Sequence, residues 1–175
     1  MVYHRVMEAE ALRKLQAPLK ARYKEHPEQA RVTLRARGRV HQAALSCQLE
    51  GGKPGAPAGL HPAAGGDGSL ACSGDMLLEA LVGCAGVTLA AVATAMNIEL
   101  EEARITAEGE VDFRGTLGVA KGVPVGFEAI RVIFELRTPA ADKVPKLIEL
   151  TERYCVVFQT LAKPPRIEVR PAVIC

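Results

Sequence analysis

Residues 78–96, LEALVGCAGVTLAAVATAM, are apolar at almost every position of a helix and carry one cysteine, Cys84. A helix that is apolar on all sides is buried either in a protein core or in a membrane. This stretch is roughly long enough to cross a bilayer core of about 30 Å. However, Glu79, Thr88 and Thr94 interrupt it, and the sequence offers no second span. We therefore expect the central helix of a protein core.

The remaining sequence predicts too little cover for such a helix in a single copy. The chain has 175 residues, of which 49% are hydrophobic and 24% charged, as expected for one globular domain with an appendage. One small sheet cannot bury a helix that is apolar all round. We therefore expect a homodimer in which two copies share a core.

The flanking sequence alternates between helical and strand patterns. Apolar residues recur at helical spacing over 8–25, where Pro18 should kink or split the helix, and over 142–155. Alternating patterns predict strands at 31–37, 40–50, 103–115, 128–138 and 165–174. A Gly- and Pro-rich loop at 51–69 precedes the apolar helix, for which Ser73 or Asp75 can serve as N-cap. The order predicts an α+β domain over residues 31–175 with antiparallel sheets, preceded by a helical extension at 1–30.

Charge and composition narrow the possible functions. The net charge of +2 is too small to indicate nucleic-acid binding, and the arginines near residue 35 alternate with apolar residues as on a solvated strand face. The charged N-terminus does not resemble a signal peptide, so we expect a cytoplasmic protein. The five cysteines include no C-x-x-C pair and the four histidines are scattered, so we expect no metal and no cofactor.

The residues alone leave the role of Cys84 open. A free cysteine is often a small buried hydrophobe, and the apolar neighbours of Cys84 should raise its pKa. Its position inside a helix also denies it the positive end of the helix dipole, so reactivity requires a cation from elsewhere in the fold. Cys155 follows a predicted helix at a point where the chain turns, and we expect it to be partly exposed.

Two segments resemble the OsmC/Ohr family. They are GDMLLEALVGCAGVTLAAVATAMNI at 74–98 and LIELTERYCVVFQTLAKPPRIEV at 147–169, and GFEAIRVIFELR at 126–137 between them is also similar. The resemblance extends over roughly residues 31–170. It implies an intertwined homodimer in which two long central helices are enclosed by antiparallel sheets. It also implies a thiol-dependent peroxidase that reduces organic hydroperoxides and is regenerated by an external dithiol.

The resemblance also implies roles for individual residues. Cys84 matches the cysteine that attacks the peroxide and becomes a sulfenic acid, and Cys155 matches the cysteine that then forms a disulfide with it. An arginine of the first hairpin, Arg39 in preference to Arg37, matches the cation that activates the thiol. The family pattern Cys-Pro-x-Ser is replaced here by Cys155, Val156, Val157 and Phe158.

A carboxylate that pairs with the arginine in the family has several possible counterparts here. Where the family has Asn-Pro-Glu, this chain has Cys72, Ser73, Gly74 and Asp75. Asp75 could supply a shifted acid, Cys72 could replace it or resolve the sulfenic acid, and Glu79 could be a buried partner or an exposed residue. The alternative to the enzyme is a non-catalytic dimer that binds a small hydrophobic ligand, with both cysteines as packing.

Overall fold

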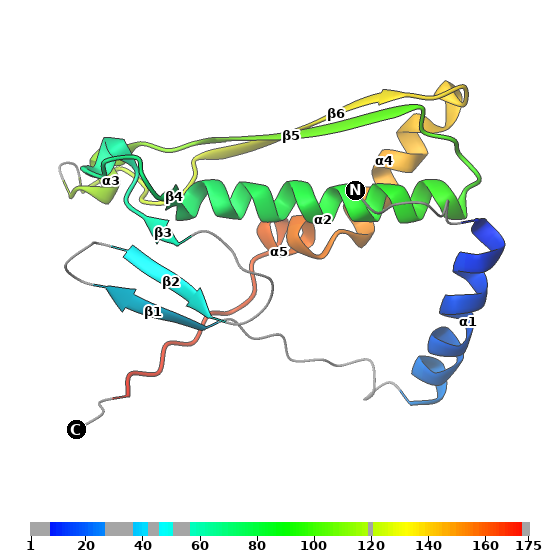
Figure 1. The fold of residues 1–175 in the computed structure, drawn as a ribbon, viewed down its shortest axis with the longest axis horizontal. Helices are drawn as coiled ribbons and strands as arrows, with labels where there is room; N and C mark the ends of the chain where they lie inside the picture. The colour runs from blue at the N-terminus through cyan, green and yellow to red at the C-terminus, as the bar shows by residue number, and fades with distance from the viewer. Residues whose placement is uncertain (1–7, 27–36, 42–45, 51–56, 119–120, 173–175) are drawn as a thin grey trace.

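The computed structural model describes residues 8–26, 37–41, 46–50, 57–118 and 121–172. A 23-residue helix, α2 (Ser73–Ala95), runs through the centre of the molecule (Figure 1). Strands β5 (Glu102–Glu110) and β6 (Ala129–Arg137) run along one side of it. Helices α4 (Val144–Tyr154) and α5 (Val156–Ala162) also pack against α2. The mixed α+β class expected from the sequence is confirmed.

The apolar helix begins and ends close to the predicted positions, but its N-cap differs from the prediction. Cys72 occupies the N-cap position and its side chain makes no capping hydrogen bond, whereas Ser73 and Asp75 lie within the first turn. The proposed capping by Ser73 or Asp75 is therefore wrong. At the other end Asn97 has a φ of 52°, the left-handed conformation in which helices commonly terminate.

Strands β5 and β6 form a two-stranded antiparallel ribbon whose two faces differ. Glu102 pairs with Arg137 at one end and Glu110 with Ala129 at the other. The half-buried side chains of β6 are those predicted by alternation, namely Ile130, Val132, Phe134 and Leu136. The opposite face carries exposed ion pairs, such as Arg131 with Glu108 and Arg137 with Glu102. The apolar face therefore packs toward α2 and the charged face is solvated.

The core lies between the second half of α2, α4 and the ribbon. Leu89 and Ala93 of α2 are buried together with Ile98 and Leu147, and the half-buried Ile105 and Phe134 pack against them. Burial follows one narrow stripe of α2, with Leu81, Ala85, Leu89 and Ala93 four residues apart. The rest of the apolar helix is half-buried or exposed in the single chain.

A four-stranded sheet precedes α2 in the chain. Its order is β1 (Arg37–His41), β2 (Ser46–Glu50), β3 (Ala58–Gly59) and β4 (Ala71–Cys72), with an antiparallel β1–β2 hairpin and a parallel β3–β4 pair. Between β3 and β4 a short helix, η3 (Pro62–Ala64), brings His61 onto Phe113 of α3 (Phe113–Thr116), with ring centroids 4.7 Å apart. A hairpin is present, but the prediction that its strands are 31–37 and 40–50 is wrong, because β1 runs through Gly38 and the predicted second strand is divided between β1 and β2. Part of the predicted loop has regular structure.

Helix α1 (Ala9–Glu25) is continuous through Pro18, so of the two expected effects of this proline the split is excluded. Two expectations about the region after Cys155 are wrong. Residues 156–162 form α5 rather than a turn. The strand predicted at 165–174 is absent from its described part, residues 165–172, where Ile167 and Val169 are exposed. The remaining short helix, η4 (Ala141–Lys143), leads directly into α4.

Candidate active site

Cys84 lies in the middle of α2 and faces the junction of α4 and α5. It is half-buried, between the buried Leu81 and Ala85 on one side and the exposed Gly83 and Val87 on the other. Thr88, one turn further along, donates its hydroxyl to the carbonyl of Cys84 at 2.8 Å. The sulfur is therefore held by a regular helix at the edge of the exposed apolar surface.

Cys155 occupies a break in the helical chain between α4 and α5. The residue has φ −75° and ψ 111°, an extended conformation that ends one helix and starts the next. Its N–H donates to the carbonyl of Thr151 at 2.9 Å, and its Sγ accepts a hydrogen bond from the N–H of Phe158 at 3.5 Å. Cys155 is 1% exposed, so the expectation that it is partly exposed is wrong. The break turns the side chain toward α2 instead of toward solvent.

The two thiols contact each other and have opposite pKa shifts. Burial raises the pKa of Cys84, but hydrogen bonds from the N–H of Val157, the thiol of Cys155, the N–H of Val156 and the hydroxyl of Thr88 outweigh it. The pKa of Cys84 therefore lies below its ordinary value. The pKa of Cys155 is raised, mainly by burial and also by Cys84, despite the N–H of Phe158. Of the two thiols, Cys84 is therefore the one that loses its proton at lower pH.

The groups that lower the pKa of Cys84 are not visible in the sequence pattern, from which the helix dipole is excluded and a cation is expected. Two of the four groups are N–H groups in the first turn of α5, those of Val156 and Val157. No pattern in the sequence identified these groups, because α5 itself was not predicted.

The candidate supporting residues Asp75, Glu79 and Cys72 are not among the groups that act on the pKa of Cys84. Asp75 and Glu79 are exposed and line an open hollow of about 510 Å³ between α2 and β5. Cys72 is twelve residues from Cys84, about 18 Å along the helix axis, whereas a disulfide requires Cα atoms within about 7 Å. Of the two readings of Glu79, the structure supports the exposed residue, and Cys72 cannot bridge Cys84 in the same chain.

The predicted arginines lie on β1. In the backbone register of the hairpin, Arg39 pairs with Gln48 and Arg37 with Glu50. Those side chains are outside the described part of the structure. The hairpin projects away from α2 in Figure 1. The assignment of Arg39, with Arg37 as the second choice, stays a prediction.

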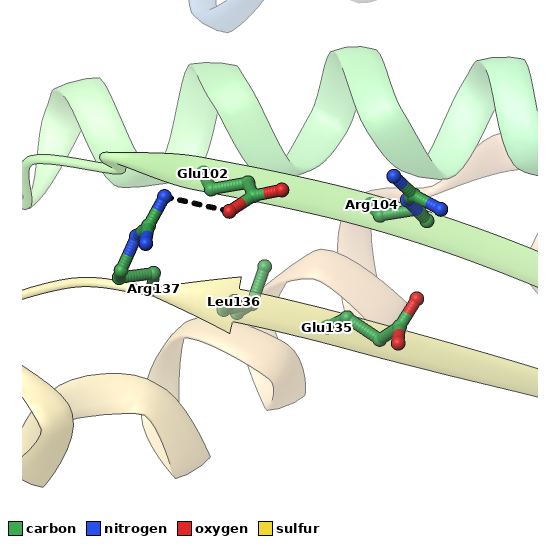
Figure 2. A pocket seen from close by; sticks show the side chains of 5 residues that line it. All are labelled: Glu102, Arg104, Glu135, Leu136 and Arg137. Carbon is green, nitrogen blue, oxygen red and sulfur yellow. Dashed lines mark hydrogen bonds and ion pairs between the residues drawn. The ribbon is translucent and has the colours of Figure 1, made fainter.

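Two hollows differ sharply in chemistry. One of about 340 Å³ is lined mainly by apolar side chains, including Leu81 of α2, Phe127 just before β6, Ile130 of β6, and Phe158 and Leu161 of α5. Leu81 lies three residues before Cys84, and Phe158 donates to Cys155. The other, shown in Figure 2, lies on the charged face of the ribbon among Glu102, Arg104, Glu135, Leu136 and Arg137. Only the first is suited to an apolar ligand next to the thiols.

Metal ligands do not gather in the described residues. Within the described ranges, no three His, Cys, Asp or Glu side chains form a group that could hold a metal ion. Cys72, Cys84 and Cys155 are free thiols there. Of these thiols, Cys84 and Cys155 contact each other.

Solved structures with a similar fold share little sequence with this chain. An OsmC-like protein from Mycoplasma pneumoniae has a TM-score of 0.63 at 16% identity, over 76% of this chain and 89% of its own. The organic hydroperoxide resistance protein OhrB of Bacillus subtilis has a TM-score of 0.53 at 18% identity, over 76% and 93%. An organic hydroperoxide resistance protein OsmC from Legionella pneumophila has a TM-score of 0.54 at 14% identity, over 76% and 93%.

Comparison of the sequence with known proteins and protein families identifies one family. No curated protein matches the chain. The family model described as OsmC-like protein matches residues 66–170, which include α2, the ribbon, both contacting cysteines and α5. With the similar fold and the two thiols in contact, this match shows that the chain belongs to the OsmC-like protein family.

Proposed function

We propose that this protein is a thiol-dependent peroxidase that reduces organic hydroperoxides. The Cys84 thiolate attacks the distal peroxide oxygen, the O–O bond breaks, and the alkoxide leaves and takes a proton to become the alcohol. Cys84 is then a sulfenic acid. The Cys155 thiol attacks that sulfur, a disulfide forms and water leaves. An external dithiol reduces the disulfide by two successive exchanges and is itself oxidised.

The observation that carries this proposal is the contact between two sulfurs with opposite pKa shifts. Hydrogen bonding lowers the pKa of Cys84 below its ordinary value, which favours the nucleophilic thiolate. Burial raises the pKa of Cys155, so it keeps its proton until Cys84 is oxidised. Packing alone requires neither the contact nor this division of protons. Both cysteines lie within residues 66–170, which match the OsmC-like family model, and this supports the same assignment.

The surroundings of the thiols support an apolar substrate. The 340 Å³ hollow, whose lining includes Leu81 and Phe158 but neither Cys84 nor Cys155, can take the alkyl or aryl group of a hydroperoxide. The organic hydroperoxide resistance proteins with a similar fold agree with this substrate class. The same hollow also suits the alternative function, a non-catalytic module that binds a hydrophobic ligand. The reducing conditions that a dithiol requires agree with a cytoplasmic location.

A homodimer forms part of the proposal. Among the described helices, α2 is long and apolar enough to cross a membrane, and much of its surface is uncovered in one chain. Val87 is 74% exposed and continues a strip of exposed small residues, Ala80, Gly83 and Ala90, on the same side of the helix. Small side chains allow two helices to approach closely. We infer that the α2 helix of a second copy covers this strip, and that Cys84 lies at its edge.

The function is tested by counting thiols. Reduced protein is mixed with one equivalent of cumene hydroperoxide, and the thiols are then counted and mapped by mass spectrometry. We expect two thiols to disappear as one Cys84–Cys155 disulfide within a chain, with cumyl alcohol formed in equal amount. Untouched thiols would contradict the peroxidase and favour the binding module.

The dimer is tested by sedimentation at micromolar concentration. We expect the wild-type chain to sediment as a dimer and Val87→Lys to shift it to a monomer, because the buried charge would lie in the apolar interface. Glu99→Lys is a matched control, since Glu99 is exposed beyond the end of α2. A folded wild-type monomer would contradict the inference.

A further inference from the structure

The break between α4 and α5 releases backbone groups that a continuous helix would pair. In an unbroken helix the N–H of Val156 would donate to the carbonyl of Glu152, four residues earlier. Here the last such bond of α4 runs from Cys155 to Thr151 and the first of α5 from Gln159 to Cys155. The N–H groups of residues 156–158 are therefore free to face the two sulfurs. The carbonyls of residues 152–154 are left without their helical donors.

One side chain replaces a donor that α4 has lost. The amide nitrogen of Gln159 donates to the carbonyl of Glu152 at 2.9 Å, and this contact is partly buried. It is the carbonyl that the N–H of Val156 would otherwise occupy. The bond also joins the last turn of α4 to the first turn of α5 across Cys155.

We propose that Gln159 is a positioning residue of the thiol pair, which keeps the helix break at Cys155 open by taking the place of Val156 at the carbonyl of Glu152. With that carbonyl satisfied, the N–H groups of Val156 and Val157 stay directed at Cys84 and that of Phe158 at Cys155. Without it, a partly buried carbonyl lacks its donor, and the N–H of Val156 is the group that would pair with it in a continuous helix. The inference rests on the proposed function for its biological meaning, but its geometry is independent of peroxide chemistry.

The positioning role of Gln159 can be measured separately, because Gln159 is not itself one of the groups that act on the pKa of Cys84. Among the described residues, the shift in the pKa of Cys84 comes from burial and from hydrogen bonds of Val157, Cys155, Val156 and Thr88. The titratable member of this set is Cys155. A change at Gln159 introduces no charge if the replacement is methionine, which has a similar length and no N–H donor. Any shift therefore reports the position of the α5 backbone.

The experiment measures the pH dependence of alkylation of Cys84 by iodoacetamide, without peroxide, with the Cys84 peptide quantified by mass spectrometry. For Gln159→Met we expect the midpoint to move to higher pH and alkylation below the midpoint to slow about fivefold, because a hydrogen bond to the thiolate is weakened. Thr160→Val, an exposed change on the same helix, should leave the profile unchanged. If the Gln159→Met chain does not fold, Gln159→Asn, one methylene too short to reach Glu152, should give the same direction.

The outcomes separate this role from a structural one and from the proposed function. A lower melting temperature with an unchanged Cys84 midpoint would mean that Gln159 only joins the helices, and it would overturn the inference. A shifted midpoint in a protein that does not consume peroxide would support the inference while contradicting the peroxidase.

Discussion

The two cysteines sit on backbones of opposite kind. Cys84 belongs to an unbroken 23-residue helix, whereas Cys155 lies between two helices at a residue with extended dihedral angles. A regular helix uses its own N–H groups internally and has none to offer a sulfur that it carries. At the break, the N–H groups of residues 156–158 have no carbonyl partner within the helix and are available to the sulfurs. The continuous helix thus positions the nucleophile, and the residues at the break supply three of the four hydrogen-bonding groups that lower its pKa, those of Cys155, Val156 and Val157.

The difference between the two cysteines shows that burial alone does not determine the direction in which a thiol pKa is shifted. Cys155 is the more buried of the two, and burial dominates the rise in its pKa. Cys84 is partly buried as well, but four hydrogen-bonding groups reverse the effect of burial. The direction of the shift depends on which groups another element brings to the sulfur.

The largest expected effect comes from replacing each of the two cysteines in turn. Cys84→Ser should abolish peroxide consumption and leave Cys155 unoxidised, because the protonated and buried thiol is a poor nucleophile. Cys155→Ser should still react once and leave a sulfenic acid at Cys84, which dimedone traps and mass spectrometry detects. Peroxide consumption that persists in Cys84→Ser would show that Cys84 is not the attacking thiol.

A proline at the break should produce the next largest effect. Val156→Pro removes one N–H near Cys84 but fits the backbone, since proline is tolerated at the first position of a helix and Cys155 is already extended. We expect the pKa of Cys84 to rise and its alkylation at neutral pH to slow about tenfold, as for loss of a hydrogen bond to a charged group. The measurement is the pH profile of alkylation.

Val156→Ala is the matched control for that experiment. It keeps the N–H and shortens a side chain that is 68% exposed, so the Cys84 profile should match that of the wild type. If proline and alanine gave the same profile, the N–H of Val156 would have no part in activating Cys84. In the family pattern Cys-Pro-x-Ser this position is proline, so Val156→Pro introduces into this chain the residue of that pattern.

The pH dependence of peroxide reduction should follow Cys84. Because the pKa of Cys84 is below its ordinary value, the thiolate is present above that lowered pKa and is lost as the pH falls through it. Stopped-flow rates with cumene hydroperoxide should therefore stay high at pH values below the ordinary thiol pKa of about 8.5 and decline only at lower pH. A rate that rises only near the ordinary thiol pKa would show that the α5 donors do not reach Cys84.

The smallest effect is expected within α2 itself. Thr88→Val removes a hydroxyl that lowers the pKa of Cys84 while keeping the shape of the side chain. Since this is the weakest of the four contributions, we expect alkylation of Cys84 at neutral pH to slow about twofold. An effect larger than that of Val156→Pro would mean that the continuous helix, and not the broken one, supplies the main hydrogen bond.

Local patterns predicted most of the regular elements. The apolar run around Cys84 gave α2, and the alternation of Ile130, Val132, Phe134 and Leu136 gave β6 with the correct face inward. Helix α5 was missed because Val156, Val157 and Phe158 are residue types that favour strands, and here packing against α2 overrides that preference. The C-terminal strand was predicted from an alternation whose apolar residues, Ile167 and Val169, are exposed in the single chain.

The sequence by itself determined that one helix would be central, that it would carry a cysteine, and that a second cysteine would follow the last amphipathic helix. These features depend on spacing along the chain, which a pattern records directly. Only the tertiary structure decided that Cys155 is buried, that it contacts Cys84 and that the α5 N–H groups lower the pKa of Cys84. The physical reason is that hydrogen-bond donors and desolvation act through space, between elements more than seventy residues apart in this chain.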